Sequence, residues 1–275
     1  MKVLITIIVL FREARKSFAF KDKRTLAVFY TLLSLYIKSK LSKKNNRIIT
    51  HNIDRFIVRA YDYPTLIQLY REIFLEAVYR FETTETKPLI IDCGANIGMS
   101  VLFFKKCFPE SEVWAFEPNP NAFSLLEVNV KQNNIENITL FPFALSDANG
   151  PIDFYIPLAK GSLNGSSWKG EGKSEKISVE ALKLSELIQQ RKVTCVKIDV
   201  EGDEEKVIWD LADNHVLDFV DSLIVEYHQT KNYSETSLAR FLSYMDESGF
   251  DCQQPPTDSS KKEVILYFNK KPVSI

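Results

Sequence analysis

The sequence predicts an α/β fold, in which a mostly parallel sheet is covered by helices on both faces. The first observation is that short apolar segments, such as LIID at 89–92 and VTCVKIDV at 193–200, alternate with segments of helical spacing. Strands buried on both faces have this composition, and helices commonly connect parallel strands. The second observation is that 45% of the 275 residues are apolar and 26% are charged, which is ordinary for a soluble globular protein.

The regular alternation follows an expected strand at 55–61 and an expected helix at 65–81, which comes after Pro64. From Pro88 onward, strands and helices follow one another to the end of the chain. The expected strands are 89–92, 112–118, 138–145, 193–200, 222–228 and 264–268, and the expected helices are 99–108, 121–134, 204–213 and 237–249. Ligands of such sheets bind at the carboxyl ends of the strands, so functional residues are expected there.

Charge divides the chain into unequal parts. Residues 1–47 hold 12 Lys and Arg against two acidic residues, a formal charge of +10, so the remainder carries −11. A basic end on an acidic body predicts an anionic surface as partner, either lipid or nucleic acid. We expect a basic helical extension at 1–45, a strand–helix lead-in at 46–86 and a ligand-binding domain at 87–275.

The extension contains two apolar stretches, 3–11 and 25–37, both shorter than the roughly 20 residues that cross a bilayer as a helix. No small-residue cleavage site follows the first stretch, so a secretory signal is not expected. Lysines flank the second stretch, which predicts a helix lying on the cytoplasmic surface of a membrane. A helix packed against its own domain, or against a partner copy, fits the pattern equally well.

The four cysteines, Cys93, Cys107, Cys195 and Cys252, show neither CxxC nor metal-finger spacing. Cys195 lies in an apolar run and is expected to pack as a small hydrophobic side chain. We therefore expect reduced thiols in a cytoplasmic protein.

A glycine-containing turn, DCGANIG at 92–98, separates the first strand of the domain from its helix. Glycine allows a sharp turn and the close approach of a ligand to the main chain. The spacing of Gly94 and Gly98 lacks the middle glycine of the dinucleotide motif GxGxxG, and Asp92 would repel a phosphate. An acid suits the ammonium of an amino-acid group, which favours S-adenosylmethionine over a nicotinamide dinucleotide.

The second strand supports this cofactor. It ends in AFEPNP, which places Glu117 where its carboxylate can accept hydrogen bonds from both hydroxyls of a ribose. Asp92 and Glu117 could each merely solvate a strand end. Their separation by about one βαβ unit makes the pair a stronger indication than either acid alone.

Five segments in this order, IDCGANIG, VWAFEPNP, FALSDANG, VKIDVEGDE and IVEYH, resemble the FkbM family of S-adenosylmethionine-dependent methyltransferases. The upstream segment REIF…Y at 71–79 resembles that family too. The resemblance covers roughly residues 65–230 and leaves residues 1–45 outside. It implies a class I, Rossmann-like methyltransferase fold with a mostly parallel seven-stranded sheet. It also implies O-methylation of a small-molecule or glycan acceptor, such as a sugar or a secondary metabolite.

The same resemblance implies roles for individual residues. The methionine part of the cofactor would be surrounded by Asp92, Gly94, Asn96 and Gly98. Glu117 would hold the ribose, and Ala144, just past the third strand, would lie near the adenine.

Methyl transfer to an alcohol needs alignment and usually a base that takes the hydroxyl proton. Asp199 and Glu201 follow the fourth strand, and helix capping is the alternative role for both. Glu226 and His228 share one face at the end of the fifth strand, because side chains alternate along a strand. We expect His228 to be the base, with Asp199 as its competitor. A divalent cation held by Asp199, Glu226 and His228 is the alternative.

Residues 158–176 hold four of the nine glycines, together with several serines. This composition predicts a flexible loop, and long loops in compact domains are often lids. As part of a lid, Trp168 would stack on the acceptor; a solvated linker without a ligand is the alternative.

Other functions fit the sequence less well. An RNA methyltransferase could use the basic amino end, but the body lacks basic residues interleaved with aromatic ones, so no nucleic acid is expected as a partner. A non-catalytic scaffold would not need an intact glycine turn together with Glu117 and Asp199. The identity of the acceptor, a metal requirement and the oligomeric state stay open at this level.

Overall fold

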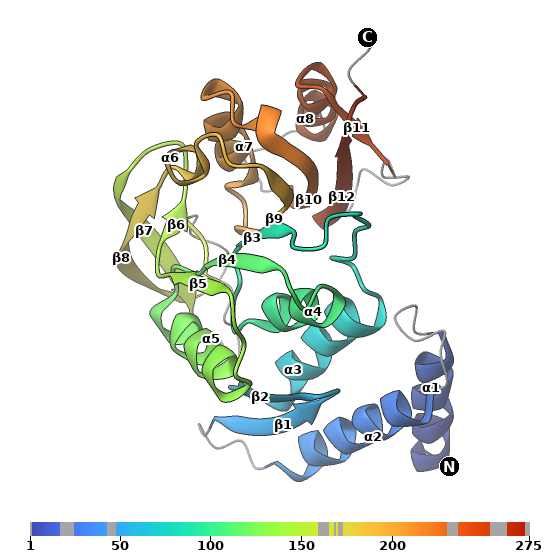
Figure 1. Ribbon diagram of the computed structural model, residues 1–275. Helices are drawn as coiled ribbons and strands as arrows, with labels where there is room; N and C mark the ends of the chain where they lie inside the picture. The colour runs from blue at the N-terminus through green and yellow to red at the C-terminus, as the bar shows by residue number, and fades with distance from the viewer. Residues whose placement is uncertain are drawn as a thin grey trace.

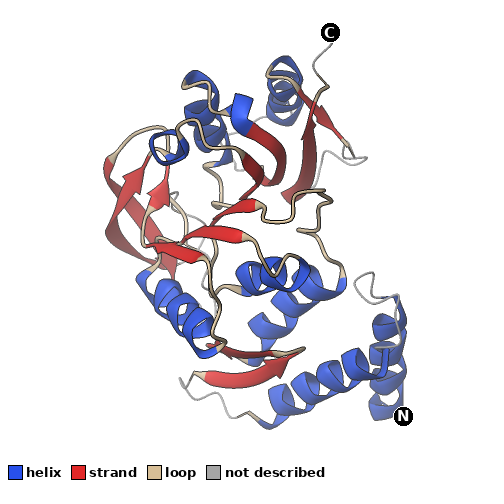
Figure 2. Ribbon diagram, in the orientation of Figure 1, coloured by secondary structure: helices blue, strands red, loops and turns tan. Residues whose placement is uncertain are grey.

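The structure is a computed structural model that describes residues 2–16, 25–42, 48–158, 165–167, 169, 173–229, 236–253 and 263–272. Its centre is a seven-stranded sheet with helices on both faces and a smaller sheet at one side (Figure 1 and, by secondary structure, Figure 2). The strands of the main sheet are, in spatial order, β11 (Phe250–Cys252), β12 (Glu263–Lys270), β10 (Val220–His228), β9 (Val193–Ile198), β3 (Leu89–Cys93), β4 (Glu112–Phe116) and β5 (Ile138–Phe141).

The directions of the strands confirm the expected sheet. From β10 through β9, β3 and β4 to β5 all neighbours are parallel, whereas β12 runs antiparallel to both β10 and β11. The strand order changes direction at β3, which lies between β4 and β9. Such a switch point opens a crevice at the carboxyl ends of the strands. The class I methyltransferase fold is therefore confirmed, and the crevice is where a site is expected.

Alternating side chains of the strands supply two separate cores, one on each face. The helices on the first face are α4 (Met99–Cys107) and α5 (Pro120–Gln132), and those on the second face are α6 (Leu184–Ile188), α7 (Glu204–Asp213) and α8 (Thr236–Glu247). In β3, Ile90 packs on the first face, whereas Leu89 and Ile91 pack on the second. Both faces of the sheet are covered, as the apolar strands predict.

The N-terminal segment forms a further layer on the first face. It consists of α1 (Lys2–Lys16), α2 (Thr25–Leu41), the antiparallel hairpin of β1 (Ile49–Ile53) and β2 (Phe56–Ala60), and α3 (Tyr63–Leu69). The buried Val28, Leu32 and Leu35 of α2 belong to the same apolar cluster as Ile90 of the sheet. The helical extension thus shares the core of the domain. Among the described residues, no helix has both the length and the apolar character needed to cross a bilayer.

The helix expected at 65–81 is shorter than predicted and changes its type. It begins after Asp62, whose side chain accepts a hydrogen bond from the Thr65 N–H at 2.8 Å. A π-helical segment, η2 (Tyr70–Leu75), continues α3, and the chain then leaves the helix. The prediction of a helix beyond residue 75 was wrong. Because the helix ends early, Tyr79 is free to turn toward the ends of the central strands.

The single strand expected at 138–145 is two strands in two different sheets. β5 ends at Phe141, and Pro142 follows, which has no N–H with which to continue a ladder. β6 (Ala144–Leu145) instead joins β7 (Gly150–Pro157) and β8 (Ser174–Leu182) in a three-stranded sheet. β7 and β8 have no counterpart among the expected elements, because they bury only a small apolar cluster and leave most of their other residues half-buried or exposed.

Candidate active site

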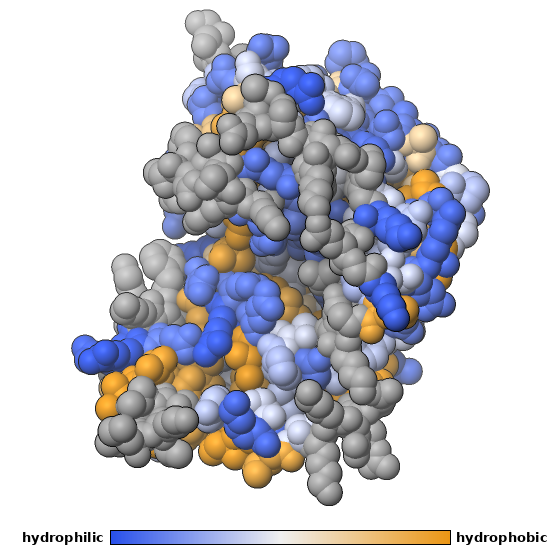
Figure 3. Space-filling model, turned by 180° about the vertical axis from the view of Figure 1, so that it is seen from behind, coloured by the Kyte–Doolittle hydropathy of each residue, from blue (hydrophilic) through white to orange (hydrophobic). Residues whose placement is uncertain are grey.

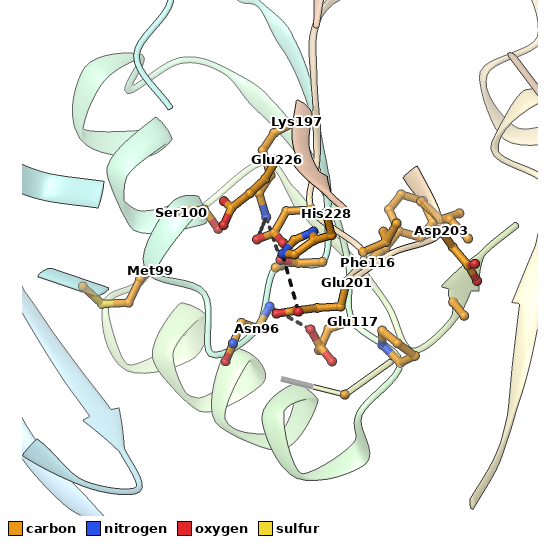
Figure 4. A pocket seen from close by; sticks show the side chains of 18 of the residues that line it. Asn96, Met99, Ser100, Phe116, Glu117, Lys197, Glu201, Asp203, Glu226 and His228 are labelled. Atoms are coloured by element: carbon orange, nitrogen blue, oxygen red, sulfur yellow. Dashed lines mark hydrogen bonds and ion pairs between the residues drawn. The ribbon is translucent and has the colours of Figure 1, made fainter. Parts of the chain in front are cut away.

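A pocket lies at the carboxyl ends of β3, β4, β9 and β10 and encloses about 1260 Å³, including its open mouth. Residues of α3 and η2 line one side of it, and residues of β6 and β7 line another (Figure 4 shows its centre). Eight of the ten predicted site residues line this pocket: Gly94, Asn96, Glu117, Ala144, Asp199, Glu201, Glu226 and His228. The other two, Asp92 and Gly98, lie behind its wall.

The β3–α4 turn has a backbone that requires glycine at its tightest point. Gly94 has a φ of +83°, and a Cβ there would lie 1.8 Å from the carbonyl oxygen of Asp199. The N–H groups of Gly94 and Ala95 both donate to the carbonyl of Phe116, at 2.9 and 2.8 Å. Asn96 also has a positive φ, +51°, which asparagine tolerates better than most residues. The first glycine of the motif is therefore required by the close approach of the chain's own backbone.

Glu117 is buried at the end of β4 and is held by two backbone N–H groups. Its Oε2 accepts from Asn96 and its Oε1 from Asn119, both at 2.8 Å (Figure 4 marks the first). Burial raises the pKa of Glu117 to about 7, although these hydrogen bonds act in the opposite direction. Each carboxylate oxygen has a second lone pair, so both can still accept from a hydroxyl in the pocket. The ribose-binding role of Glu117 stays a prediction, and its remaining lone pairs are compatible with it.

Asp92 is fully buried and faces protein groups. Its Oδ2 accepts from the Ser100 hydroxyl at 2.5 Å, and its Oδ1 lies 3.1 Å from Nζ of Lys197. Lys197 is buried as well, and it donates to the carbonyl of Gly94 at 2.7 Å. Burial disfavours the charged ammonium, but the surrounding carboxylates outweigh burial and raise the pKa of Lys197. Asp92 thus acts on the pocket through Lys197, which lines it.

At the other end of the pocket, side chains meet from distant parts of the chain. The Tyr79 hydroxyl donates to Oε2 of Glu226 at 2.8 Å, and its oxygen also lies 3.3 Å from Oδ2 of Asp199. Oδ2 of Asp199 also lies 3.2 Å from Nζ of Lys197. Burial, and then the nearby Asp199, raise the pKa of Glu226 to about 9. The carboxyl of Glu226 therefore carries a proton near neutral pH.

His228 lies among carboxylates. Its Nδ1 is 2.9 Å from Oε1 of Glu204, and its Nε2 is 3.6 Å from Oε2 of Glu201, which faces it in Figure 4. Burial lowers the pKa of His228, but the hydrogen bond to Glu204 and the other acids outweigh burial and raise it to about 10. Burial raises the pKa of Glu201 to about 7. At neutral pH His228 is therefore an imidazolium beside a carboxyl group that titrates close to neutrality.

The β9–α7 turn is strained at one of its acids. Glu201 has a φ of +58°, a conformation that non-glycine residues rarely adopt and that is often found at functional sites. The residue at the N-cap of α7 is Asp203, so neither Asp199 nor Glu201 has the capping role considered for them. The turn instead directs both acids into the pocket.

The geometry also allows a metal ion. Asp199, Glu226 and His228 each offer one ligand atom, and these atoms lie within 4.8 Å of one another. Oxygen and imidazole ligands of this kind suit Mg²⁺, Mn²⁺ or Zn²⁺. A cation there would stand close to the Lys197 ammonium, which already pairs with Asp199.

Part of the glycine-rich segment 158–176 packs against the pocket. The Ser166 hydroxyl donates to the carbonyl of Glu201 at 2.7 Å, and Gly165 lines the pocket. The segment is shorter than expected, because β8 already begins at residue 174. Trp168, which was expected to stack on the acceptor, lies outside the described residues.

Tyr79, Lys197 and Glu263 are among the site residues that the sequence prediction missed. Lys197 left a signal, because it is a charged residue inside the otherwise apolar strand VTCVKI. Glu263 lies directly opposite His228 in the β10–β12 pair, a register that the sequence does not reveal. Tyr79 was missed because the expected helix at 65–81 included it, whereas the observed helical segment ends at Leu75.

Comparison with known proteins gives a consistent picture. A family model described as the methyltransferase FkbM domain matches residues 92–252, more than half of the chain. Methyltransferase 1 of Beauveria bassiana is 26% identical over 220 residues, 72% of this chain and 86% of that protein. Hexuronic acid methyltransferase AglP of Haloferax volcanii is 32% identical over 176 residues, 60% of this chain and 69% of that protein. The 31-O-demethyl-FK506 methyltransferase FkbM of Streptomyces tacrolimicus is 30% identical over 178 residues, 53% and 68% respectively.

Proposed function

The chain belongs to the FkbM family of S-adenosylmethionine-dependent methyltransferases, and from this premise we propose that it methylates a hydroxyl oxygen of a sugar, glycan or secondary metabolite. One observation carries the proposal: one pocket is lined both by the glycine turn with Glu117 and by Asp199 with His228. The names of two relatives support the acceptor class, since one acts on a hexuronic acid and the other on 31-O-demethyl-FK506.

The residues of the first end fit the cofactor. Glu117 would hold the ribose hydroxyls with its remaining lone pairs, Ala144 would lie near the adenine, and Asn96 with the main chain at Gly94 would adjoin the methionine part. Carboxylates along the pocket suit a ligand with a positive sulfur and an ammonium. Bound there, the cofactor supplies a methyl group whose bond to sulfur breaks as the new bond to the acceptor oxygen forms.

The second end would position the acceptor and take its proton. The hydroxyl proton must pass to a base, and an imidazolium has no lone pair with which to accept it. We therefore assign proton acceptance to the β9–α7 turn, to the carboxylate of Asp199 or Glu201. His228, 3.6 Å from Glu201, would favour the ionised form of Glu201 against the burial that raises its pKa. This assignment moves the base from His228, the residue favoured by the sequence, to its acidic neighbours.

The charge of the pocket narrows the acceptor class further. In the described lining, the acids at this end outnumber the basic groups Lys197 and His228 even without Glu226, which is protonated near neutral pH. These acids are Glu72, Asp199, Glu201, Asp203 and Glu263. Like charges brought together in a partly buried pocket repel strongly. The preferred acceptor is therefore a neutral or cationic hydroxyl compound, such as a neutral sugar or an amino sugar.

Three matched acceptors test the proposal. The enzyme would be incubated with methyl-labelled S-adenosylmethionine and a neutral hexoside, its amino-sugar analogue or its uronic acid analogue, and the products analysed by mass spectrometry. Labelled methyl ethers of the first two sugars are expected. Methylation of the uronic acid alone would contradict the charge argument, and label found only on nitrogen or carbon would contradict O-methylation.

A metal-assisted reaction is the second candidate, supported by the arrangement of Asp199, Glu226 and His228. A divalent cation there would lower the pKa of the acceptor hydroxyl and reduce the need for a base. Activity measured after chelation, and again after addition of Mg²⁺ or Mn²⁺, distinguishes metal assistance from proton acceptance by a carboxylate. Activity that is lost and then restored favours the metal, and activity that is unchanged by the chelator favours the carboxylates.

A further inference from the structure

Exposed apolar side chains are concentrated on the two N-terminal helices. Ten large apolar side chains of the described residues are exposed, and seven of them belong to α1 and α2. They are Ile8, Val9 and Phe11 on α1, and Leu26, Tyr30, Ile37 and Leu41 on α2. Figure 3 shows apolar surface gathered over this end of the molecule, at the lower left of the view. We call these seven side chains the outer apolar surface.

Helix α2 has apolar side chains on opposite sides. Val28, Leu32 and Leu35 face inward and are buried in the core. Leu26 and Leu41, 60% and 75% exposed, lie on the opposite side together with Tyr30 and Ile37, because their spacing of four, seven and four residues returns to the same side of a helix. A helix that is apolar all round is normally buried, so the outer side of α2 calls for a partner that the described residues do not supply.

The outer apolar surface is bordered by positive charge. Arg12 and Arg15 on α1 and Lys38 and Lys40 on α2 are all exposed. On α1, Arg12 and Arg15 lie four and seven residues after Ile8, so they share its side of the helix. The segment as a whole carries +10 between residues 1 and 47.

We propose that α1 and α2 bind the surface of an anionic lipid bilayer, with the outer apolar surface in the headgroup region and the basic side chains against lipid phosphates. Both helices are too short to cross a bilayer, whereas interfacial helices combine an apolar side with flanking Lys and Arg in this way. A second copy of the chain is a poorer partner. A two-fold interface would join two surfaces that are each bordered by basic residues and have the same sign of charge.

The helices of the outer apolar surface pack against the helices that line the pocket. α2 packs against α3, and Arg71 of η2 pairs with Glu13 of α1 at 3.0 Å. α3 and η2 also contribute Gln68 and Glu72 to the acceptor end of the pocket. The segment between the lipid surface and the pocket is thus a single layer of helix. A bound enzyme would receive acceptors that are themselves attached to, or assembled at, a membrane.

Vesicle sedimentation with point variants tests the proposal. Deleting the helices is unsuitable, because α2 contributes core residues. The full chain would be mixed with vesicles of phosphatidylcholine alone or of phosphatidylcholine with phosphatidylserine. We expect binding to the second kind, weakened at about 1 M salt, where the Debye length falls to about 3 Å. The double variant Arg12→Gln/Arg15→Gln should bind about 20- to 30-fold more weakly, since each charge near an anionic leaflet contributes about fivefold.

An apolar variant and a matched control complete the experiment. Leu26→Gln/Tyr30→Gln/Ile37→Gln should lose vesicle binding at all salt concentrations, and Leu158→Gln, which alters an exposed leucine away from these helices, should not. Both should keep the thermal unfolding midpoint and cofactor affinity of the parent. Parent protein that ignores anionic vesicles would overturn the proposal. So would a dimer in light scattering that the triple variant converts to a monomer, which would assign the surface to a second copy.

Discussion

The two ends of the pocket are built in different ways. At the cofactor end, Glu117 is held by N–H groups of Asn96 and Asn119, all within one strand–helix–strand unit. At the acceptor end, Tyr79 contacts Glu226, 147 residues further along the chain. The first end is local and depends mainly on backbone geometry, whereas the second exists only once the sheet has assembled. Substitutions should therefore separate into those that change cofactor binding and those that change turnover.

The largest effect is expected at the acceptor end. Asp199→Asn removes a carboxylate that lines the pocket while keeping its size and its oxygen next to Lys197. Turnover should fall by about 10²–10⁴-fold, the usual contribution of a positioned acid or base. Steady-state kinetics with labelled cofactor measures this. Asp153→Asn, which alters an exposed acid paired with Lys176, is the matched control and should behave as the parent. Unchanged turnover in Asp199→Asn would show that the Asp199 carboxylate does not take part in the reaction.

A smaller effect on stability is expected in the glycine turn. Gly94→Ala would place a Cβ 1.8 Å from the Asp199 carbonyl, whereas Gly249→Ala has a similar φ, +86°, and nothing within 4 Å. Both variants bear the strain of a positive φ, about 1–2 kcal/mol, and only the first adds a clash of about 1–3 kcal/mol. Denaturant unfolding of the two variants compares them directly. Equal losses of unfolding free energy in the two variants would show that the added Cβ at residue 94 causes no destabilising clash.

A still smaller effect concerns pH. The folded-state pKa of Glu117, about 7, lies above its ordinary value of 4.5, so the folded state holds this proton more tightly. The contribution of Glu117 to stability is therefore complete below about pH 4.5 and is lost as pH rises through about 7. Without cofactor, the unfolding midpoint of Glu117→Gln should fall less between pH 5 and pH 8 than that of the parent. Glu127→Gln, an exposed acid on α5, should keep the parent's slope. A slope shared by all three proteins would contradict the raised pKa.

The same contrast explains which features could be read from the sequence. The turn from Asp92 to Gly98 and the acid at Glu117 were predicted because glycine spacing and a strand end are local features. The structure also brings Asp199 and His228 together, as parallel strands predict, because their carboxyl ends meet at one edge. The register that places Glu263 opposite His228 and the early end of η2 depend on tertiary packing, so the sequence pattern contains no signal for them.

The N-terminal helices illustrate a different limit. The core buries Val28 and Leu32 of α2 and leaves Leu26 exposed on the same apolar helix. Where nearly every residue of a helix is apolar, period alone does not select the buried side. The neighbouring α3 and the hairpin of β1 and β2 determine it.

Calorimetric titration of S-adenosylmethionine into two variants tests the separation of the two ends most directly. Glu117→Ala, at the cofactor end, should weaken binding by about 1–3 kcal/mol, the cost of losing charged hydrogen bonds in a buried site. Glu226→Gln, at the acceptor end, replaces a carboxyl group that is protonated near neutral pH by a neutral amide of similar shape, so cofactor affinity should stay within a few tenths of a kcal/mol of the parent. Equal losses in both variants, or unchanged affinity in Glu117→Ala, would contradict the division of the pocket into a cofactor end and an acceptor end.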